Sequence, residues 1–344
     1  MIVDYFMTTV YRPILKVAWQ IIWRAKYLWF FGFFAAFVAA SGEFNLMINN
    51  FSDLNSESGF ANSLKDLYTQ GLLGNFGSHF IDLLKSLNPG AWLLVALLFL
   101  LLLFFVWLST VSEAGVIMGA YREYRKQPSD FMLSFKAGRQ NFWPVFWLNL
   151  LGKVFVYAVL FILSAPLLWI YLKTANTTWQ LILFLISFVI LIPVSAIISF
   201  LIKYAVMYAV LRKEKISGAI KNGWQLFLKN WVVSLEMAIL MFLVSIMFGL
   251  AMIVLAIVLA IPLALILYVI YTLNVAGSAL AAVLIALIFL AIIFFVIGAM
   301  LSTYQLTAWV LLFDRLNESQ VFPKIARLIA GFVERRKNSA VPKI

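Results

Sequence analysis

The chain has 344 residues, of which 65% are apolar and 12% are charged, and its formal net charge is +12. Ordinary soluble domains carry about 45–50% apolar and about 25% charged residues, so this composition excludes a soluble globular protein and predicts an all-α, polytopic membrane protein. The chain has no cysteine, which excludes disulfide and thiolate chemistry, and its one histidine cannot form a histidine metal cluster.

A short phrase occurs three times, each time before a long apolar run, at residues 15–20, 135–140 and 220–225. It consists of an apolar residue, a lysine, a small residue two places later and a glutamine four places later. Residues four apart share a helical face, so the lysine and glutamine form a polar stripe. In the third copy the opposite face is apolar, with Ile216, Ala219, Ile220, Phe227 and Trp231. The phrase therefore predicts an amphipathic helix that lies in a membrane surface.

The first predicted elements are a cytoplasmic amphipathic helix at residues 1–26 and a transmembrane hairpin at residues 27–120. Between the two spans of this hairpin lies a polar, acidic loop at residues 41–90, in which two short amphipathic segments are expected. The apolar run that ends before Ser41 and Gly42 also resembles a cleaved signal sequence. We favour an uncleaved span, because the same arrangement precedes two later spans that cannot be cleaved signals.

Two further hairpins are predicted, at residues 142–211 and at residues 231–313. The second of these regions is almost wholly apolar, and its best break lies at residues 273–277. Two long spans there would imply tilt, kinks or protrusion, and three or four shorter spans are the alternatives. Residues 314–344 form a basic cytoplasmic tail, in which residues 324–327 repeat the phrase in degenerate form without a following span.

The distribution of charge sets the expected topology. Basic residues outside the apolar runs gather at the two ends of the chain and in the connections before the second and third hairpins, whereas the loop at residues 41–90 is acidic. The positive-inside rule then places both termini in the cytoplasm and this loop outside. With both termini on one side, the number of spans must be even. This favours a single membrane domain that comprises residues 1–344 and has six spans, arranged as three hairpins that are each preceded by an interfacial helix. Either true repetition, which implies a pseudo-threefold arrangement, or the shared physics of basic helices explains the phrase.

Four ionisable residues lie in the cytoplasmic half of the predicted spans: Glu113, Lys153, Lys203 and Glu236. Such charges are costly and usually face the interior of a helix bundle. We favour lysines that reach the interface and charges that pair between helices, and the alternative is a polar, cytoplasm-facing cavity for a charged ligand. The glycines of Gly115-x-x-x-Gly119 predict close helix packing. Cations of the surface helices and the tail are candidate contacts for anionic lipid head groups: Lys16, Arg24, Lys136, Arg139, Lys221, Lys229, Lys324 and Arg327.

The chain contains none of the short motifs of hydrolases, metalloproteases or nucleotide-binding proteins. The sequence predicts a non-enzymatic protein that engages membrane lipids, preferentially anionic ones, or assists other membrane components, which would make a membrane protein its partner. The alternative is a transporter of a lipid or a small charged solute, and a lipid phosphodiesterase activity is a distant third. We expect no catalytic residue, cofactor or metal site. We also expect no nucleic-acid partner, because the topology accounts for the positive net charge.

The combination of a span end rich in small residues, the phrase and a following hairpin resembles the membrane-embedded domain associated with bacterial glycerophosphodiester phosphodiesterases and its stand-alone relatives. The residues that carry the resemblance are the phrases at 16–20, 136–140 and 221–225, with the span ends at 118–120 and 207–209. The second copy departs from the pattern, since Arg139 stands where the others have tryptophan. The resemblance implies a multi-pass protein of a prokaryotic plasma membrane. It brings no catalytic residue, because nothing in the chain corresponds to the soluble phosphodiesterase domain.

Overall fold

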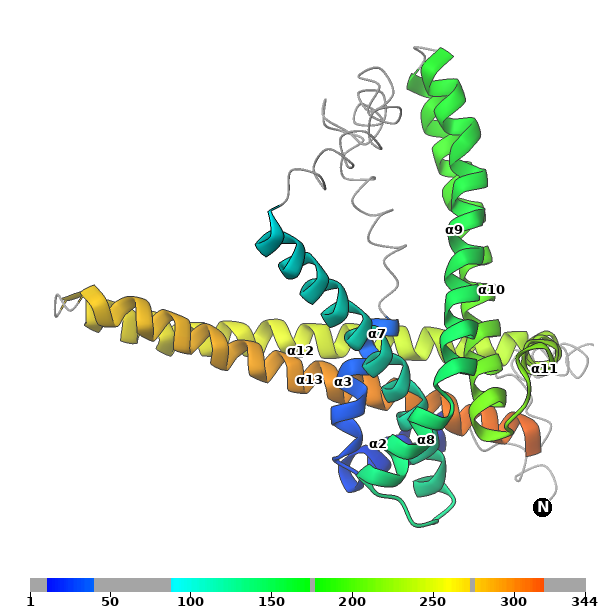
Figure 1. Cartoon of the computed structure of the whole chain (residues 1–344), viewed down its shortest axis with the longest axis horizontal. Coiled ribbons are helices and arrows are strands. Elements are labelled where there is room, and N and C mark those ends of the chain that lie inside the picture. Colours follow the sequence, from blue (N-terminus) through cyan, green and yellow to red (C-terminus); the bar gives the residue numbers. More distant parts are fainter. Residues whose placement is uncertain (1–10, 40–87, 174–176, 273–275, 319–344) are drawn as a thin grey trace, which may run out of the picture. The chain divides into compact units, whose positions relative to one another are not determined.

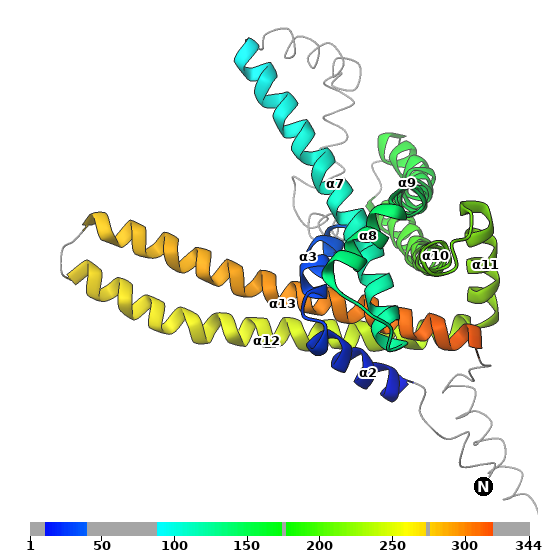
Figure 2. The same ribbon diagram turned by 60° about the horizontal axis from the view of Figure 1, so that its bottom comes forward.

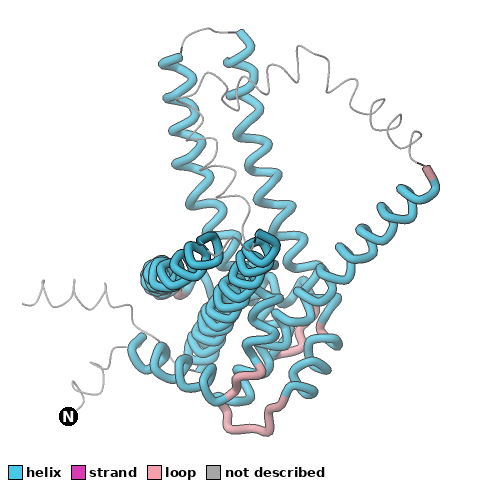
Figure 3. Tube along the Cα trace, turned by 90° about the vertical axis from the view of Figure 1, so that its left-hand side faces the viewer, coloured by secondary structure: helices cyan, strands magenta, loops and turns pink. Residues whose placement is uncertain are grey.

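The structure is a computed structural model of the chain, and it describes residues 11–39, 88–173, 177–272 and 276–318 (Figure 1). Within these ranges every regular element is an α-helix, which confirms the all-α prediction (Figure 3). Nearly all of the predicted outer loop and of the basic tail lies outside the described residues.

The described helices fall into short ones of 10–14 residues and long ones of 32–43 residues. In chain order they are α2 (Tyr11–Arg24), α3 (Leu28–Ala39), α7 (Pro89–Tyr124), α8 (Phe131–Gln140), α9 (Phe142–Lys173), α10 (Thr177–Leu211), α11 (Ile216–Lys229), α12 (Trp231–Thr272) and α13 (Ala276–Glu318). The three copies of the phrase lie on α2, α8 and α11, which are 14, 10 and 14 residues long. Each of them is followed closely by a further helix, as the sequence predicts.

Among the described residues, five helices are long and apolar enough to cross a membrane: α7, α9, α10, α12 and α13. A hydrocarbon core of about 30 Å requires about 20 helical residues, and these helices have between 32 and 43. Helix α3 has 12 described residues, and the predicted remainder of its span lies outside them. The structure is therefore that of an all-α chain consistent with a multi-pass membrane protein, while the count of six spans stays a prediction.

The chain divides into two compact units. The first comprises residues 1–37, 109–145 and 203–344, and the second comprises residues 38–108 and 146–202. The three helices that carry the phrase, α2, α8 and α11, are called here the surface helices. The first unit holds these three helices, and it also holds α12, α13 and the carboxyl-terminal ends of α7 and α10. The second unit holds most of α9 and of α10.

In the second unit, α9 and α10 run side by side (Figures 1 and 2). Gly152 of α9 allows a close approach, since a β-carbon there would lie 2.7 Å from Ile202 Cγ1 of α10. Helix α10 continues through Pro193. A larger residue at position 152 would force these two helices apart.

In the first unit, α12 and α13 pack against each other (Figure 2). Helix α12 ends at Thr272 and α13 begins at Ala276. Of the break predicted at residues 273–277, residues 273–275 lie outside the described residues. Helix α12 continues through Pro262, so this proline does not end the helix.

Glycines also bring α7 and α8 together in the first unit. A β-carbon on Gly119 would lie 2.7 Å from Ser134 Oγ of α8, and one on Gly115 would lie 3.3 Å from the Ser134 carbonyl oxygen. This confirms that the Gly115-x-x-x-Gly119 motif is a point of close helix packing. Gly138 of α8 is equally tight, because a β-carbon there would overlap the Val111 carbonyl oxygen of α7.

Candidate functional site

Each surface helix exposes its cations and buries the small residue of its phrase. The six candidate lipid contacts within the described ranges are all exposed: Lys16, Arg24, Lys136, Arg139, Lys221 and Lys229. The small residue is buried in every copy, at Ala18, Gly138 and Gly223. Helix α2 packs against α13, and α11 packs against α12. The remaining two candidates, Lys324 and Arg327, lie outside the described residues.

A corner joins α8 to α9 and α11 to α12. The Asn141 side-chain amide donates to the Ala137 carbonyl at 2.8 Å, and that of Asn230 donates to the Leu226 carbonyl at 3.1 Å. Each asparagine thus satisfies a carbonyl in the last turn of the surface helix, and the long helix begins at the next residue. Trp231 is therefore the first residue of α12 and is 55% exposed, so its predicted place on the apolar face of α11 is wrong.

The corners show how far each surface helix continues beyond the lysine of its phrase, which the phrase alone does not indicate. Lys16 and Lys221 lie nine residues before Ala25 and Asn230, where their surface helices have ended, whereas Lys136 lies five residues before Asn141. Helix α8 is 10 residues long against the 14 of α11, so the second copy lacks about one helical turn. At these two corners, an asparagine directly before an aromatic residue that opens a long apolar run is the sequence signal.

Glu236 joins the first surface helix to α12. Its side chain is 9% exposed, and its carboxylate accepts a hydrogen bond from the Tyr11 hydroxyl of α2. Tyr11 is itself buried at the start of α2. The contact bridges helices 225 positions apart and supplies the hydrogen bond that a buried carboxylate requires.

Glu113 lies on α7 and Lys203 lies on α10. The two side chains attract each other electrostatically within the first unit. The Lys203 ammonium also lies 4.8 Å from the ring centre of Trp309 on α13, which is a cation–π contact. Lys153 is half-buried on α9 and belongs to the second unit. Three of the four predicted intramembrane residues thus have partners within the first unit, and the four-residue site stays a prediction.

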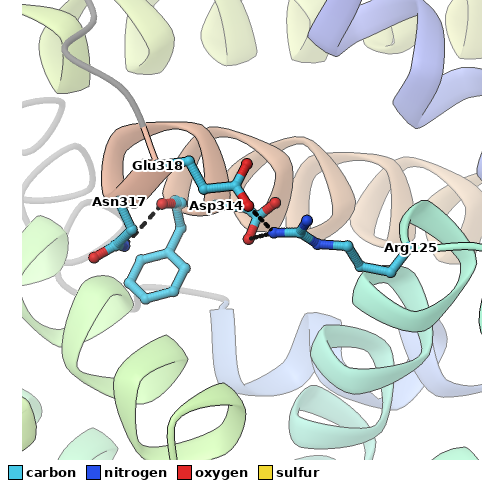
Figure 4. Close-up of polar contacts among 5 residues, drawn as sticks. Arg125, Asp314, Asn317 and Glu318 are labelled. Carbon is cyan, nitrogen blue, oxygen red and sulfur yellow. Dashed lines mark hydrogen bonds and ion pairs between the residues drawn. The ribbon is translucent and has the colours of Figure 1, made fainter.

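Ion pairs join the carboxyl-terminal ends of α7 and α13 (Figure 4). Arg125, the residue after α7, donates to Asp314 Oδ1 at 2.8 Å and also to Glu318. The Asp314 side chain is 3% exposed, whereas those of Arg125 and Glu318 are 34% and 51% exposed. The hydrogen bonds to Glu318 and then to Asp314 raise the pKa of Arg125 above its ordinary value. The sequence identifies Arg125 only as one of the basic residues in the connection before the second hairpin, because nothing local marks a partner so distant in the chain.

Helix α10 reaches the same end of α13. The Tyr208 hydroxyl donates to Asn317 Oδ1 at 2.8 Å, and the Tyr208 ring packs edge-on against Phe313 with ring centres 4.8 Å apart. The Asn317 amide donates in turn to the Phe313 carbonyl at 2.9 Å (Figure 4). Together with the Arg125 ion pairs, these bonds connect the end of α13 with the end of α7 and with the end of α10.

No protein-family model, curated protein or solved structure matches this chain. The resemblance to the membrane domain associated with glycerophosphodiester phosphodiesterases therefore rests on the phrase and the span ends alone and stays a prediction.

Proposed function

We propose that the chain is a non-enzymatic protein of a prokaryotic plasma membrane, with six spans in three hairpins and both termini in the cytoplasm. Its three surface helices bind anionic lipid head groups and hold the ends of the long helices at the cytoplasmic leaflet. The observation that carries this proposal is the exposure of cations on α2, α8 and α11 opposite a buried face. A cationic face above an apolar one is the pattern of a helix bound to a membrane surface.

Exposed tryptophans on the same helices support this placement. Trp19 and Trp23 on α2 are 41% and 45% exposed, and Trp224 on α11 is 41% exposed. Tryptophan is enriched at the boundary between lipid and water, because its ring is apolar and its N–H is polar. Cations and tryptophans on one helix favour a lipid surface over bulk water as its surroundings.

The buried charges favour a structural role over the alternative of a transport cavity. Glu236 is hydrogen-bonded to Tyr11, and Lys203 is attracted electrostatically by Glu113 and makes a cation–π contact with Trp309. Charges that are paired between helices stabilise a bundle without a ligand. The contacts therefore support interhelical pairing as the role of these residues.

The proposal is tested by lipid binding to the purified full chain in a neutral detergent. Native mass spectrometry would compare the binding of phosphatidylglycerol with that of phosphatidylcholine, for the unaltered chain and for a Lys16→Gln, Arg24→Gln variant. A cation near an anionic surface contributes about fivefold in affinity, so removing two is expected to weaken phosphatidylglycerol binding about 30-fold. Binding of phosphatidylcholine should not change.

A variant with Arg212→Gln and Lys213→Gln is the matched control. Both residues are exposed and their replacement removes the same charge, but they lie in the connection between α10 and α11. We expect a much smaller loss for the control. An equal loss in both variants would assign lipid binding to bulk charge, and no preference for phosphatidylglycerol in the unaltered chain would contradict the proposal.

A further inference from the structure

The pair α12 and α13, called here the third hairpin, is apolar over an unusual length. No Asp, Glu, Lys or Arg occurs from residue 237 to residue 313. At about 1.5 Å per residue, the charge-free parts measure about 54 Å in α12 and about 57 Å in α13. The charge-free parts of α7 (residues 89–112) and of α10 (residues 177–202) measure only about 36 Å and about 39 Å.

These lengths imply different inclinations in a membrane. A hydrocarbon core of about 30 Å accommodates 36–39 Å of apolar helix at about 35–40° from the membrane normal, within the observed range of 0–40°. For the third hairpin, the same core thickness requires an inclination of about 55° from the membrane normal. At ordinary inclinations the tip of this hairpin would leave the hydrocarbon, which is costly for apolar side chains.

The first surface helix contacts both helices of the third hairpin. Helix α2 packs against α13. Tyr11 at its start bonds to Glu236 of α12, and one turn later the Leu15 carbonyl accepts a hydrogen bond from the Tyr304 hydroxyl of α13 at 3.5 Å. These contacts hold the end of the hairpin that carries Glu236 at the proposed surface helix, which lies in the plane of the membrane. The inclination of the hairpin follows from its apolar length.

Exposed apolar side chains form a wide band on each helix of the third hairpin. On α12 they include Ile246, Leu250, Ile253, Val254, Ile257, Val258 and Ile261, and on α13 they include Leu284, Ile285, Ile288, Phe289 and Ile292. A single partner helix would cover one narrow stripe of such a band, whereas acyl chains cover all of it. We infer that the third hairpin lies obliquely in the bilayer, at about 55° from its normal, with lipid acyl chains as its covering partner. This inference rests on the proposed membrane location.

Depth measurements on single-cysteine variants test the inclination, since the chain has no cysteine of its own. Nitroxide labels at Ile239→Cys and Ile261→Cys would lie about 33 Å apart along α12, at positions that are 51% and 59% exposed. Collision rates with oxygen and with an aqueous nickel complex report depth in vesicles of phosphatidylcholine and phosphatidylglycerol. An inclination of about 55° gives a depth difference of about 19 Å, and one of 40° or less gives about 25 Å or more.

Ile186→Cys and Ile197→Cys on α10 are the matched control pair. Both positions are exposed, and the labels lie about 17 Å apart along the helix, so an ordinary inclination gives a depth difference of about 13 Å or more. A difference of about 25 Å on α12, or a label at position 261 in contact with water, would overturn the oblique hairpin and leave the membrane location intact. Water contact at all four positions would instead overturn the proposed function. Spin–spin broadening that grows with the protein-to-lipid ratio would identify a second copy of the chain, and not lipid, as the covering partner.

Discussion

Replacement of Gly138 by alanine tests whether the small residue of the phrase is a point of helix packing. The new β-carbon would overlap the Val111 carbonyl oxygen and lie 2.9 Å from Val111 Cγ1. The carbonyl belongs to the backbone of α7 and cannot turn aside as a flexible side chain could. Helix α8 must therefore shift away from α7 to admit the methyl group.

The cost follows from two opposing effects. Overpacking a tight contact costs about 1–3 kcal/mol, and alanine in place of glycine stabilises a helix by at most about 1 kcal/mol. The stabilising effect is at its low end here, because α8 ends at Gln140, two residues later. We expect Gly138→Ala to lower the free energy of unfolding by about 1–2 kcal/mol.

The measurement is reversible unfolding of the purified chain in mixed detergent micelles, followed by circular dichroism. Gly298→Ala on α13 is the matched control, since no atom lies within 4 Å of its β-carbon position. The control should be unchanged or more stable by up to about 1 kcal/mol. Equal stability of Gly138→Ala and the unaltered chain would refute the assignment of this glycine to close packing.

Two further predictions follow from the described contacts, and a third follows from the distribution of charge in the sequence. Arg125→Gln removes the cation from a buried carboxylate and should destabilise the chain by about 1–3 kcal/mol, because the exposed third of the arginine already reduces the strength of the pair. Glu318→Gln should have a smaller effect, and equal effects would contradict the role of burial. The raised pKa of Arg125 adds stability that is fully present below the ordinary pKa of an arginine and is lost only as pH rises through the raised pKa, so the Arg125→Gln difference should not vary between neutral and mildly alkaline pH. Tyr11→Phe should cost about 1–3 kcal/mol and less in a Glu236→Gln background, and additive losses in that double-mutant cycle would exclude a bond between them. A cysteine at Ser58 should react with an impermeant maleimide added outside intact cells, and reaction from the cytoplasmic side alone would reverse the topology.

The elements that the sequence predicts correctly are those encoded by local patterns. Apolar length identifies the long helices. The buried and exposed faces of α2 follow from residues three and four apart, such as Ala18 and Ile22 on one side and Lys16 and Gln20 on the other. These features depend on near neighbours in the chain, so a single sequence contains them.

The features that the sequence analysis missed depend on distant neighbours or on a second local signal. Arg125 and Asp314 are separated by 189 positions, and neither stands in a pattern that names the other. Trp231 is apolar and at helical spacing from Phe227, so its periodicity fits α11. The cap made by Asn230 overrides that periodicity and starts a new helix. Charge counting likewise finds the buried acids but not the tyrosine hydroxyl that binds Glu236.

Contacts between the first and the last helices bear on how the repeats are arranged. Surface helix α8 packs against α7, the long helix that precedes it, and α2 packs against α13, the last described helix of the chain. The Thr303 hydroxyl of α13 donates to the Leu28 carbonyl of α3 at 3.2 Å, and Gly32 lets the two backbones approach. The first described helices thus contact the last one. This agrees with the proposed pseudo-threefold arrangement better than with an open array, in which the terminal repeats would not meet.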